Sequence, residues 1–477
     1  MSMACSERAK ALLDKEPGPA SLASIQARIG LCLYFLSTFR LNECRYTYSF
    51  AFTIATALGI HRRLSSSTKI NVLETECRKR SFWCLYILDG YLSVMLGRPR
   101  LIRDDDVDQP FPENVADIDL MSSEPIHTLP RHGNLEAFVA HARLAKLMAR
   151  ANDQLYPLYA LSSDQLLQRS NDMLDALSDW ETTLPEFLKP RARTMTGQRT
   201  FERQNTILKL GVTHARILAT RRCLLMDFGH PNANPFSQSS DARAKRSIRE
   251  CISAIIMILD TTTCLIEHGQ CYGSFWSTQY VALVAISTLY VLLIQGMRHA
   301  LPGDMESFLN VDDCFEKAKY CQNHLASLPP PRTQAERHHV LLAHLRSKVE
   351  KSLSSRRKPL GSYENSQMPS LGTTHLQDQS QNTMSIANLN NNSNFSPAQS
   401  DGLQNMQADA AAFTRPFEPN SIGGPDTMND MSMFSTMLTP NSNSDTNFQY
   451  MLDFGWESLD TIGANMRGHE MYSFGLS

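Results

Sequence analysis

The chain has 477 residues, of which 42% are hydrophobic and 20% charged, and this length allows one large domain with further segments. Its eleven cysteines are an odd number, and no signal peptide is visible before them, which excludes a complete disulfide framework and favours reduced intracellular thiols. The net charge of −2 hides an asymmetry, because residues 360–477 carry two arginines and no lysine against eight aspartates and four glutamates. A basic body with an acidic tail favours macromolecular partners.

Residues from about 20 to 350 predict one helix after another, and no run alternates with period two for long enough to predict a strand. We therefore expect an all-α body over residues 1–353. The apolar periodicity and the turn residues predict helices over 21–39, 46–59, 71–96, 135–151, 162–183, 205–227, 241–268, 275–297, 311–327 and 334–353. In the second of these, the small residues Ala51, Ala55 and Ala57 would let a neighbouring helix approach closely.

The longest apolar run, Tyr280 to Ile294, has fifteen residues, too few to cross a bilayer comfortably. It predicts a buried core helix, and we expect no membrane contact. Most of the cysteines lie among apolar residues at helical spacing, which predicts packing roles in the core. The six are Cys32, Cys77, Cys84, Cys223, Cys251 and Cys264.

The helix predicted over 71–96 has clear end signals. Asn71 is a good N-cap, and Glu74 stands at the third helical position, as in a capping box. Gly97 is placed to end the helix in a left-handed conformation, with Pro99 close behind. Asp89 is the only charged residue between Ser81 and Leu96, in a half of the helix that is otherwise apolar.

A buried carboxylate needs a partner, and Arg98, Arg100, His61 and Arg62 are the candidates. A general acid or base is the catalytic alternative for Asp89. We favour an ion-paired anchor between two helices and a loop, because no second carboxylate or histidine stands at a fixed spacing from it.

The acids at 104, 105, 106 and 108 spell D-D-x-x-D, a pattern that in an all-α protein suggests magnesium bound to a diphosphate substrate. That chemistry works from a helix, whereas these acids follow Gly-Arg-Pro and precede Pro110 and Pro112. We therefore favour a solvated acidic loop and expect no enzyme. The histidines at 338, 339 and 344 do not share one helical face, which favours surface or packing roles.

The stretches "AFTIATALGIHRR" and "ETECRKRSFWCLYILDGYLSVMLGRPRLIRDDDVDQPFP" resemble the regulatory domain of fungal binuclear zinc-cluster transcription factors. "LSDWETTLPEFL" and "LKLGVTHARILATRRCLL" resemble later parts of the same domain, so the likeness covers about residues 5–350. Gly90 departs from the family pattern, which has a basic residue after the aspartate. The residues that carry the family motif are His61, Arg62, Glu76, Arg80, Trp83, Asp89, Gly97, Arg98 and Pro99.

The resemblance implies nuclear regulation of RNA polymerase II transcription, often by homo- or heterodimers. In the family, DNA contact comes from a six-cysteine cluster that holds zinc, and this sequence contains no such cluster. We therefore expect no cofactor in this chain, and we expect it to begin inside the regulatory domain and to supply regulation and partner binding. The alternatives are an adaptor or inhibitor that pairs with related factors, and the magnesium-dependent enzyme.

From about residue 354 the composition turns to Asn, Gln, Ser and Met, which predicts a disordered acidic tail over 354–477. Residues 448–460, "FQYMLDFGWESLD", alternate apolar and acidic side chains, a composition typical of activation segments that bind coactivators. Docking of the tail on its own domain is the alternative. The candidate anchors are Phe448, Tyr450, Leu452, Phe454, Trp456 and Leu459.

Overall fold

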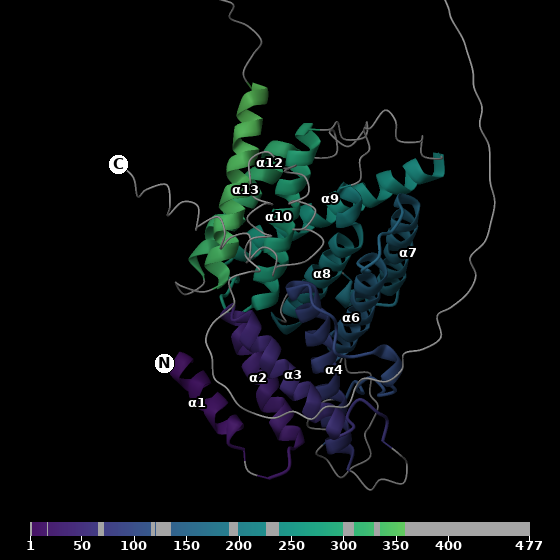
Figure 1. Ribbon diagram of the computed structural model, residues 1–477, viewed down its shortest axis with the longest axis vertical. Helices are drawn as coiled ribbons and strands as arrows, with labels where there is room; N and C mark the ends of the chain where they lie inside the picture. The colour runs from purple at the N-terminus through teal and green to yellow at the C-terminus, as the bar shows by residue number, and fades with distance from the viewer. Residues whose placement is uncertain are drawn as a thin grey trace, which may run out of the picture. The chain divides into compact units, whose positions relative to one another are not determined.

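The computed structural model describes most of the first 357 residues (Figure 1). The described ranges are 2–16, 18–64, 71–115, 120, 135–189, 199–225, 238–298, 310–328 and 334–357. The predicted tail beyond residue 357 and its segment 448–460 lie outside the described residues.

The described residues form eleven α-helices and three short 3-10 helices, and no strand, so the predicted all-α fold is confirmed for this part of the chain. The α-helices are α1 (Ser2–Asp14), α2 (Leu22–Ser37), α3 (Leu41–Ala57), α4 (Val72–Leu96), α6 (Glu136–Leu155), α7 (Ser163–Thr182), α8 (Arg199–Thr220), α9 (Gln238–Glu267), α10 (Trp276–Arg298), α12 (Val311–Ser327) and α13 (Gln334–Arg357). The 3-10 helices are η1 (Asp104–Asp106), η2 (Glu186–Leu188) and η3 (Arg221–Leu225).

The ends of α4 form as the sequence predicts. The Asn71 side chain accepts a hydrogen bond from the Glu74 amide at 2.6 Å. Only this half of the predicted capping box is found among the described contacts. Gly97 has φ +62°, a left-handed conformation that costs glycine little and ends the helix.

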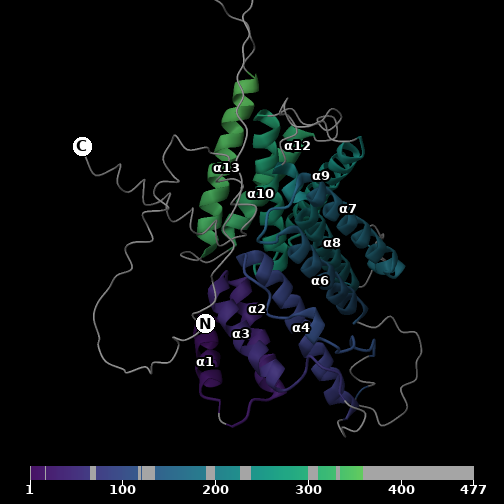
Figure 2. The ribbon, with the colours of Figure 1, turned by 45° about the vertical axis from the view of Figure 1, so that its right-hand side comes forward.

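Helix α10 lies at the centre of the packing and contacts α2, α8, α9, α12 and α13 (Figure 2). Every residue from Tyr280 to Ile294 is buried except Ser287, which is half-buried. The window Trp276–Ile294 is long and apolar enough to cross a membrane, but 89% of it is buried inside the protein. We therefore assign α10 to the core of the helical body, as predicted.

Helices α2 and α3 pack closely against each other. Ala51 and Ala55 of α3 are fully buried, as predicted, whereas Ala57 is exposed, so its predicted packing role is wrong. The Cys32 thiol donates to the Cys44 carbonyl at 3.7 Å, and the Cys44 thiol donates to the Cys32 carbonyl at 3.5 Å. The hydrogen bond with Cys32, together with burial, raises the pKa of Cys44 well above its ordinary value.

All eleven cysteines are free thiols. Cys32, Cys223 and Cys251 are buried as predicted, and Cys77 and Cys84 are half-buried. Cys264 is exposed, so its predicted core role is wrong. It lies in the last turn of α9 and points to solvent, whereas its neighbours Leu265 and Ile266 pack against the core.

Candidate functional site

Helix α4 carries a row of side chains that follow one another every three or four residues: Glu76, Arg80, Trp83, Tyr86 and Asp89. On a helix of 3.6 residues per turn, neighbours in this row lie about one turn apart, and the repeated three-residue steps make the row wind around α4. Beyond α4 the chain turns back, and residues 98–115, which we call the return segment, run along this row. The family motif predicted from sequence therefore holds one continuous piece of backbone.

The turn into the return segment depends on Gly97. The amides of Gly97 and Arg98 both donate to the carbonyl of Ser93, which closes the end of α4. The Pro99 carbonyl then accepts a hydrogen bond from the Arg45 guanidinium of α3 at 2.8 Å. The three motif residues Gly97, Arg98 and Pro99 thus act through their backbone at this turn.

Asp89 is completely buried and takes four polar contacts. Its carboxylate accepts from the amides of Leu101 at 3.0 Å and Ile102 at 2.9 Å. It also pairs with Arg45 at 3.4 Å and with Arg100 at 3.7 Å. The predicted ion-paired anchor therefore forms. Arg100 was among the predicted partners, whereas Arg45 was not.

Burial is the main influence on the Asp89 carboxyl and raises its pKa above the ordinary value. The amides of Ile102 and Leu101 act in the opposite direction, as do the guanidinium groups of Arg100 and Arg45. The contacts therefore offset much of the desolvation that burial imposes on the charged form. Each oxygen of the carboxylate is engaged in holding the chain, which favours an anchor over a general acid or base.

Tyr86 connects the row to the acidic loop. Its hydroxyl donates to Asp104 at 2.5 Å, and Arg100 donates to the same carboxylate oxygen at 3.1 Å. The guanidinium of Arg100 also lies 5.2 Å from the centre of the Tyr86 ring.

The acids at 104, 105, 106 and 108 are exposed, as predicted for a solvated loop, and the first three form η1 rather than irregular backbone. In the part of the chain that the structure describes, no group of three or more His, Cys, Asp or Glu residues is placed to hold a metal ion. The magnesium hypothesis therefore finds no support in these residues.

Trp83 holds the middle of the return segment. Its indole nitrogen donates to the Pro110 carbonyl at 3.0 Å, and its ring stacks on Phe111 with centroids 4.3 Å apart. The Arg143 guanidinium of α6 lies 5.3 Å from the centre of the Phe111 ring. Trp83 thereby combines a satisfied donor with aromatic packing, as buried tryptophans usually do.

Glu76 and Arg80 hold the end of the return segment. Glu76 is buried, pairs with Lys79 at 2.6 Å and accepts from the Glu113 amide at 3.0 Å. Arg80 donates to the Val115 carbonyl at 3.3 Å. The Glu76 carboxylate thus binds a backbone N–H group of the return segment, and the Arg80 guanidinium binds a backbone carbonyl.

The turn after α3 binds the other edge of the return segment. Gln109 donates through its side chain to the Ile60 carbonyl at 2.8 Å and through its amide to the His61 carbonyl at 3.2 Å. Arg62 donates to the Asp106 carbonyl at 3.4 Å. His61 and Arg62 therefore contact the return segment. The prediction that they pair with the buried aspartate is wrong, and so is the same prediction for Arg98.

Some residues of this site could have been predicted from their spacing in the sequence, and others could not. Tyr86 and Lys79 follow the helical spacing of the row and could have been found from it. Arg45 lies 44 positions from Asp89 along the chain, and Gln109 lies 49 positions from Ile60. Their contacts depend on tertiary packing, which no local pattern encodes.

Comparison with known protein families finds a match over the first part of the chain. The sequence profile described as "Fungal specific transcription factor domain" matches residues 4–182. The matched range contains most of α1 and all of α2 to α7, and therefore the whole row on α4 and the return segment.

Three curated relatives illustrate the likeness. "Activator of stress genes 1" of Saccharomyces cerevisiae is 26% identical over 334 residues, which is 69% of this chain and 33% of the relative. "Transcriptional activator protein acu-15" of Neurospora crassa is 24% identical over 286 residues, covering 58% and 29%. "ABC-transporter-regulating transcription factor" of Aspergillus oryzae is 23% identical over 305 residues, covering 61% and 33%.

The chain spans about a third of the length of these relatives. No solved structure matches it. The resemblance drawn from the motif on α4 is confirmed by the profile and by the relatives. Residues 4–182 are thus similar to the fungal-specific transcription factor domain, and over a longer range the chain is similar to fungal transcription regulators.

Proposed function

We propose that this chain acts in the regulation of transcription by RNA polymerase II in the nucleus. The match of residues 4–182 to the fungal transcription factor domain carries this proposal, because the motif residues of α4 lie inside it. The three relatives described above are named as activators or transcription factors. The row on α4 would contribute to this function by fixing the position of the return segment. A partner protein would then contact the surface that this segment forms.

The proposal assigns DNA contact to a zinc cluster rather than to this helical body. The sequence has no Cys-x2-Cys-x6-Cys spacing, so the described helices would supply regulation and pairing with a second copy or a related factor. The acidic tail would bind coactivators through residues 448–460, where the aromatic and aliphatic anchors stand between acids. The domain boundary that we propose lies near residue 354.

The test is a reporter assay with the full chain fused to a heterologous DNA-binding domain that is inactive alone. We expect transcription of the reporter to change, and we expect the double variant Phe454→Ala with Trp456→Ala to lose most of an activating effect. Phe413→Ala, a tail aromatic outside the segment, is the matched control. A reporter that responds to none of these fusions contradicts the proposed function.

A further inference from the structure

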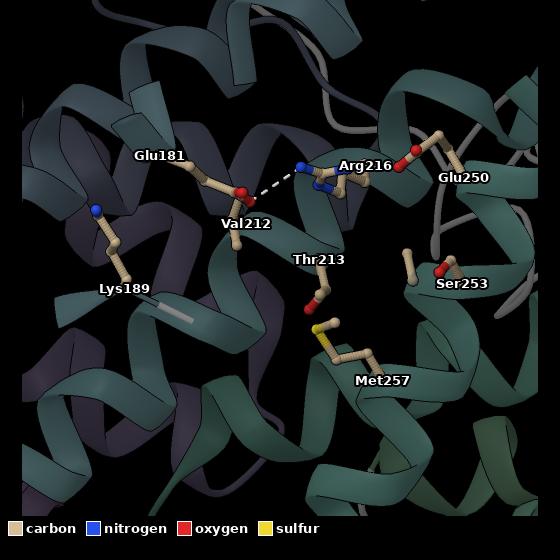
Figure 3. A pocket seen from close by; sticks show the side chains of 9 residues that line it. Glu181, Lys189, Val212, Thr213, Arg216, Glu250, Ser253 and Met257 are labelled. Carbon is tan, nitrogen blue, oxygen red and sulfur yellow. Dashed lines mark hydrogen bonds and ion pairs between the residues drawn. The ribbon is translucent and has the colours of Figure 1, made fainter. Parts of the chain in front are cut away.

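A pocket opens on the surface where the end of α7, the middle of α8 and the middle of α9 meet (Figure 3). Its volume is about 280 Å³. Glu181 comes from α7, Arg216 from α8 and Glu250 from α9, so three helices each contribute one charged side chain. The pocket lies apart from the row on α4, and no part of the proposed function uses it.

The charged groups of the pocket form one connected cluster. Arg216 donates to Glu181 at 3.0 Å through one terminal nitrogen and to Glu250 through the other. Figure 3 shows Arg216 between the two glutamates, with Thr213 and Met257 below them in the view. One guanidinium between two carboxylates leaves a formal charge of −1.

A second cation at the rim does not change this balance. Lys189 lines the pocket, but its ammonium group bonds to Glu186 at 2.6 Å. The side chains of these two residues neutralise each other. The lining itself holds two carboxylates and two cations, and Glu186 beside it brings the local formal charge to −1, which favours a cation as ligand.

The free hydrogen-bonding capacity of the pocket consists mainly of acceptors. The Thr213 hydroxyl donates to the backbone carbonyl of Lys209 at 2.7 Å, so toward the pocket its oxygen can only accept. Glu181 and Glu250 each use one oxygen for Arg216, and within the described contacts the second oxygen of each has no donor. These acceptors favour a ligand that brings hydrogen-bond donors, and the Ser253 hydroxyl, which also lines the pocket, can donate or accept.

The floor of the pocket is apolar. Val212 and Ala254 are buried, and Met257 is half-buried beside them. Ligand pockets for drug-sized molecules usually measure about 300–1,000 Å³, so this one suits a smaller molecule. Methionine adapts its shape to a bound apolar group more readily than a branched side chain does.

We propose that this pocket binds a small organic ammonium ion with a short apolar body. The ammonium group would donate to Glu181, Glu250 and the Thr213 hydroxyl oxygen. The apolar body would pack on Val212, Ala254 and Met257. This binding goes beyond the proposed transcriptional function and does not depend on it.

Calorimetry on the full chain with 2-phenylethylamine tests the proposal. The matched probes 2-phenylethanol and 3-phenylpropionate have a similar size but are neutral or negative. We expect the amine to bind at least about tenfold more tightly than either probe, because a hydrogen bond to a charged group contributes about that much. An amine that binds no more tightly than the alcohol overturns the proposal.

Variants of the lining separate binding from folding. Glu181→Gln and Glu250→Gln should each weaken amine binding about tenfold. Arg216→Gln should strengthen it by removing the competing cation, a gain that a purely structural role of the arginine would not produce. Asp172→Asn, an exposed change on α7, is the matched control and should leave binding unchanged.

Met257→Trp should fill the pocket and abolish amine binding while the helix content and the unfolding midpoint stay near those of the wild type. Because Met257→Trp changes no charge, it still tests amine binding if Glu181→Gln, Glu250→Gln or Arg216→Gln fails to fold. Wild-type affinity in Met257→Trp, or in both glutamine variants, overturns the proposal.

Discussion

Asp89 shows how a single residue decides whether the return segment is held. A carboxylate that is completely buried loses its hydration, and this loss is compensated only where cations and backbone amides surround it. The contacts come from α3 and from the return segment, so the residue joins two parts of the chain that are distant in sequence.

Replacing this carboxylate should therefore be costly. In Asp89→Asn, the neutral amide would leave Arg45 and Arg100 buried without the counter-charge that they share. We expect a loss of about 3 kcal/mol in the free energy of unfolding, measured by urea titration.

Asp105→Asn is the matched control for this change. Asp105 is exposed, so its replacement should shift the free energy of unfolding by less than about 0.5 kcal/mol. A similar loss in both variants would contradict the anchoring role of Asp89.

At the scale of helices, Gly211 marks a close approach between α8 and its neighbours. A Cβ at this position would lie 3.1 Å from Leu144 Cδ2 and 3.5 Å from the Tyr91 hydroxyl. A Cβ at Gly30, in α2, would meet no atom within 4 Å. The two helical glycines thus differ only in what surrounds them.

Alanine substitutions at these two positions should have opposite signs. Gly30→Ala should stabilise the chain by about 0.5–1 kcal/mol, because alanine is the better helix former. Gly211→Ala should destabilise it by about 1–2 kcal/mol, because the buried Leu144 side chain of α6 must shift to admit the new methyl group. Thermal unfolding measures the change in stability of both variants. A stabilised Gly211→Ala would contradict the close packing around Gly211.

A cluster of aromatic and histidine rings joins α4, α6, α8 and α10. The Tyr91 hydroxyl and His141 Nε2 are 3.0 Å apart, and the His214 ring stacks on Tyr91 at 6.0 Å. Within the described contacts, neither ring nitrogen of His214 has a hydrogen-bond partner. Burial lowers the pKa of His141 to about 4, and burial, with the charge of Arg221, lowers that of His214 to about 3.

These lowered pKa values predict a loss of stability in acid. An unfolded histidine takes up a proton near pH 6.5, whereas the folded histidines do so only near pH 4 or below, so stability falls as the pH drops through this window. His214→Phe should reduce the slope by up to about 1.4 kcal/mol per pH unit below pH 6.5.

Urea titrations at several pH values between 4 and 7 measure that slope. The control is Leu158→Ala, because Leu158 is exposed and does not titrate, so its replacement should leave the slope unchanged. An unaltered slope in His214→Phe would contradict the buried, neutral histidine.

At the scale of the whole molecule, the sequence predicted the parts that depend on local signals. The ends of α4 follow from Asn71 and Gly97, and α12 has the predicted bounds of 311–327. The start of α8 is at Arg199 rather than 205, because its first turn carries little apolar periodicity. The need for a partner at Asp89 was predictable from burial, but the choice of Arg45 was not.

The return segment was predicted only as a loop. Its path depends on pairings between residues 12 to 54 positions apart, such as Leu101 with Asp89 and Pro99 with Arg45. Such pairings follow from the packing of α3 and α4, which no short pattern encodes. The motif resemblance named the residues of the row without showing what they hold.

Helix α13 ends at Arg357, four residues beyond the predicted 353, so we propose that the domain boundary lies just after this helix. We expect residues 1–358 expressed alone to unfold cooperatively, with a midpoint within a few degrees of that of the full chain. Thermal unfolding followed by circular dichroism measures both midpoints. A large drop in the shortened chain would show that the tail contributes to the core.

The row on α4 holds the return segment, and hydrogen exchange tests this role most directly. In the wild type, the amides of Leu101 and Ile102 should exchange slowly, because both donate to a buried carboxylate. In Asp89→Asn, exchange across residues 98–115 should accelerate at least about tenfold while α12 keeps its wild-type rates. Equal exchange of the return segment in the two proteins would show that Asp89 does not hold it in place.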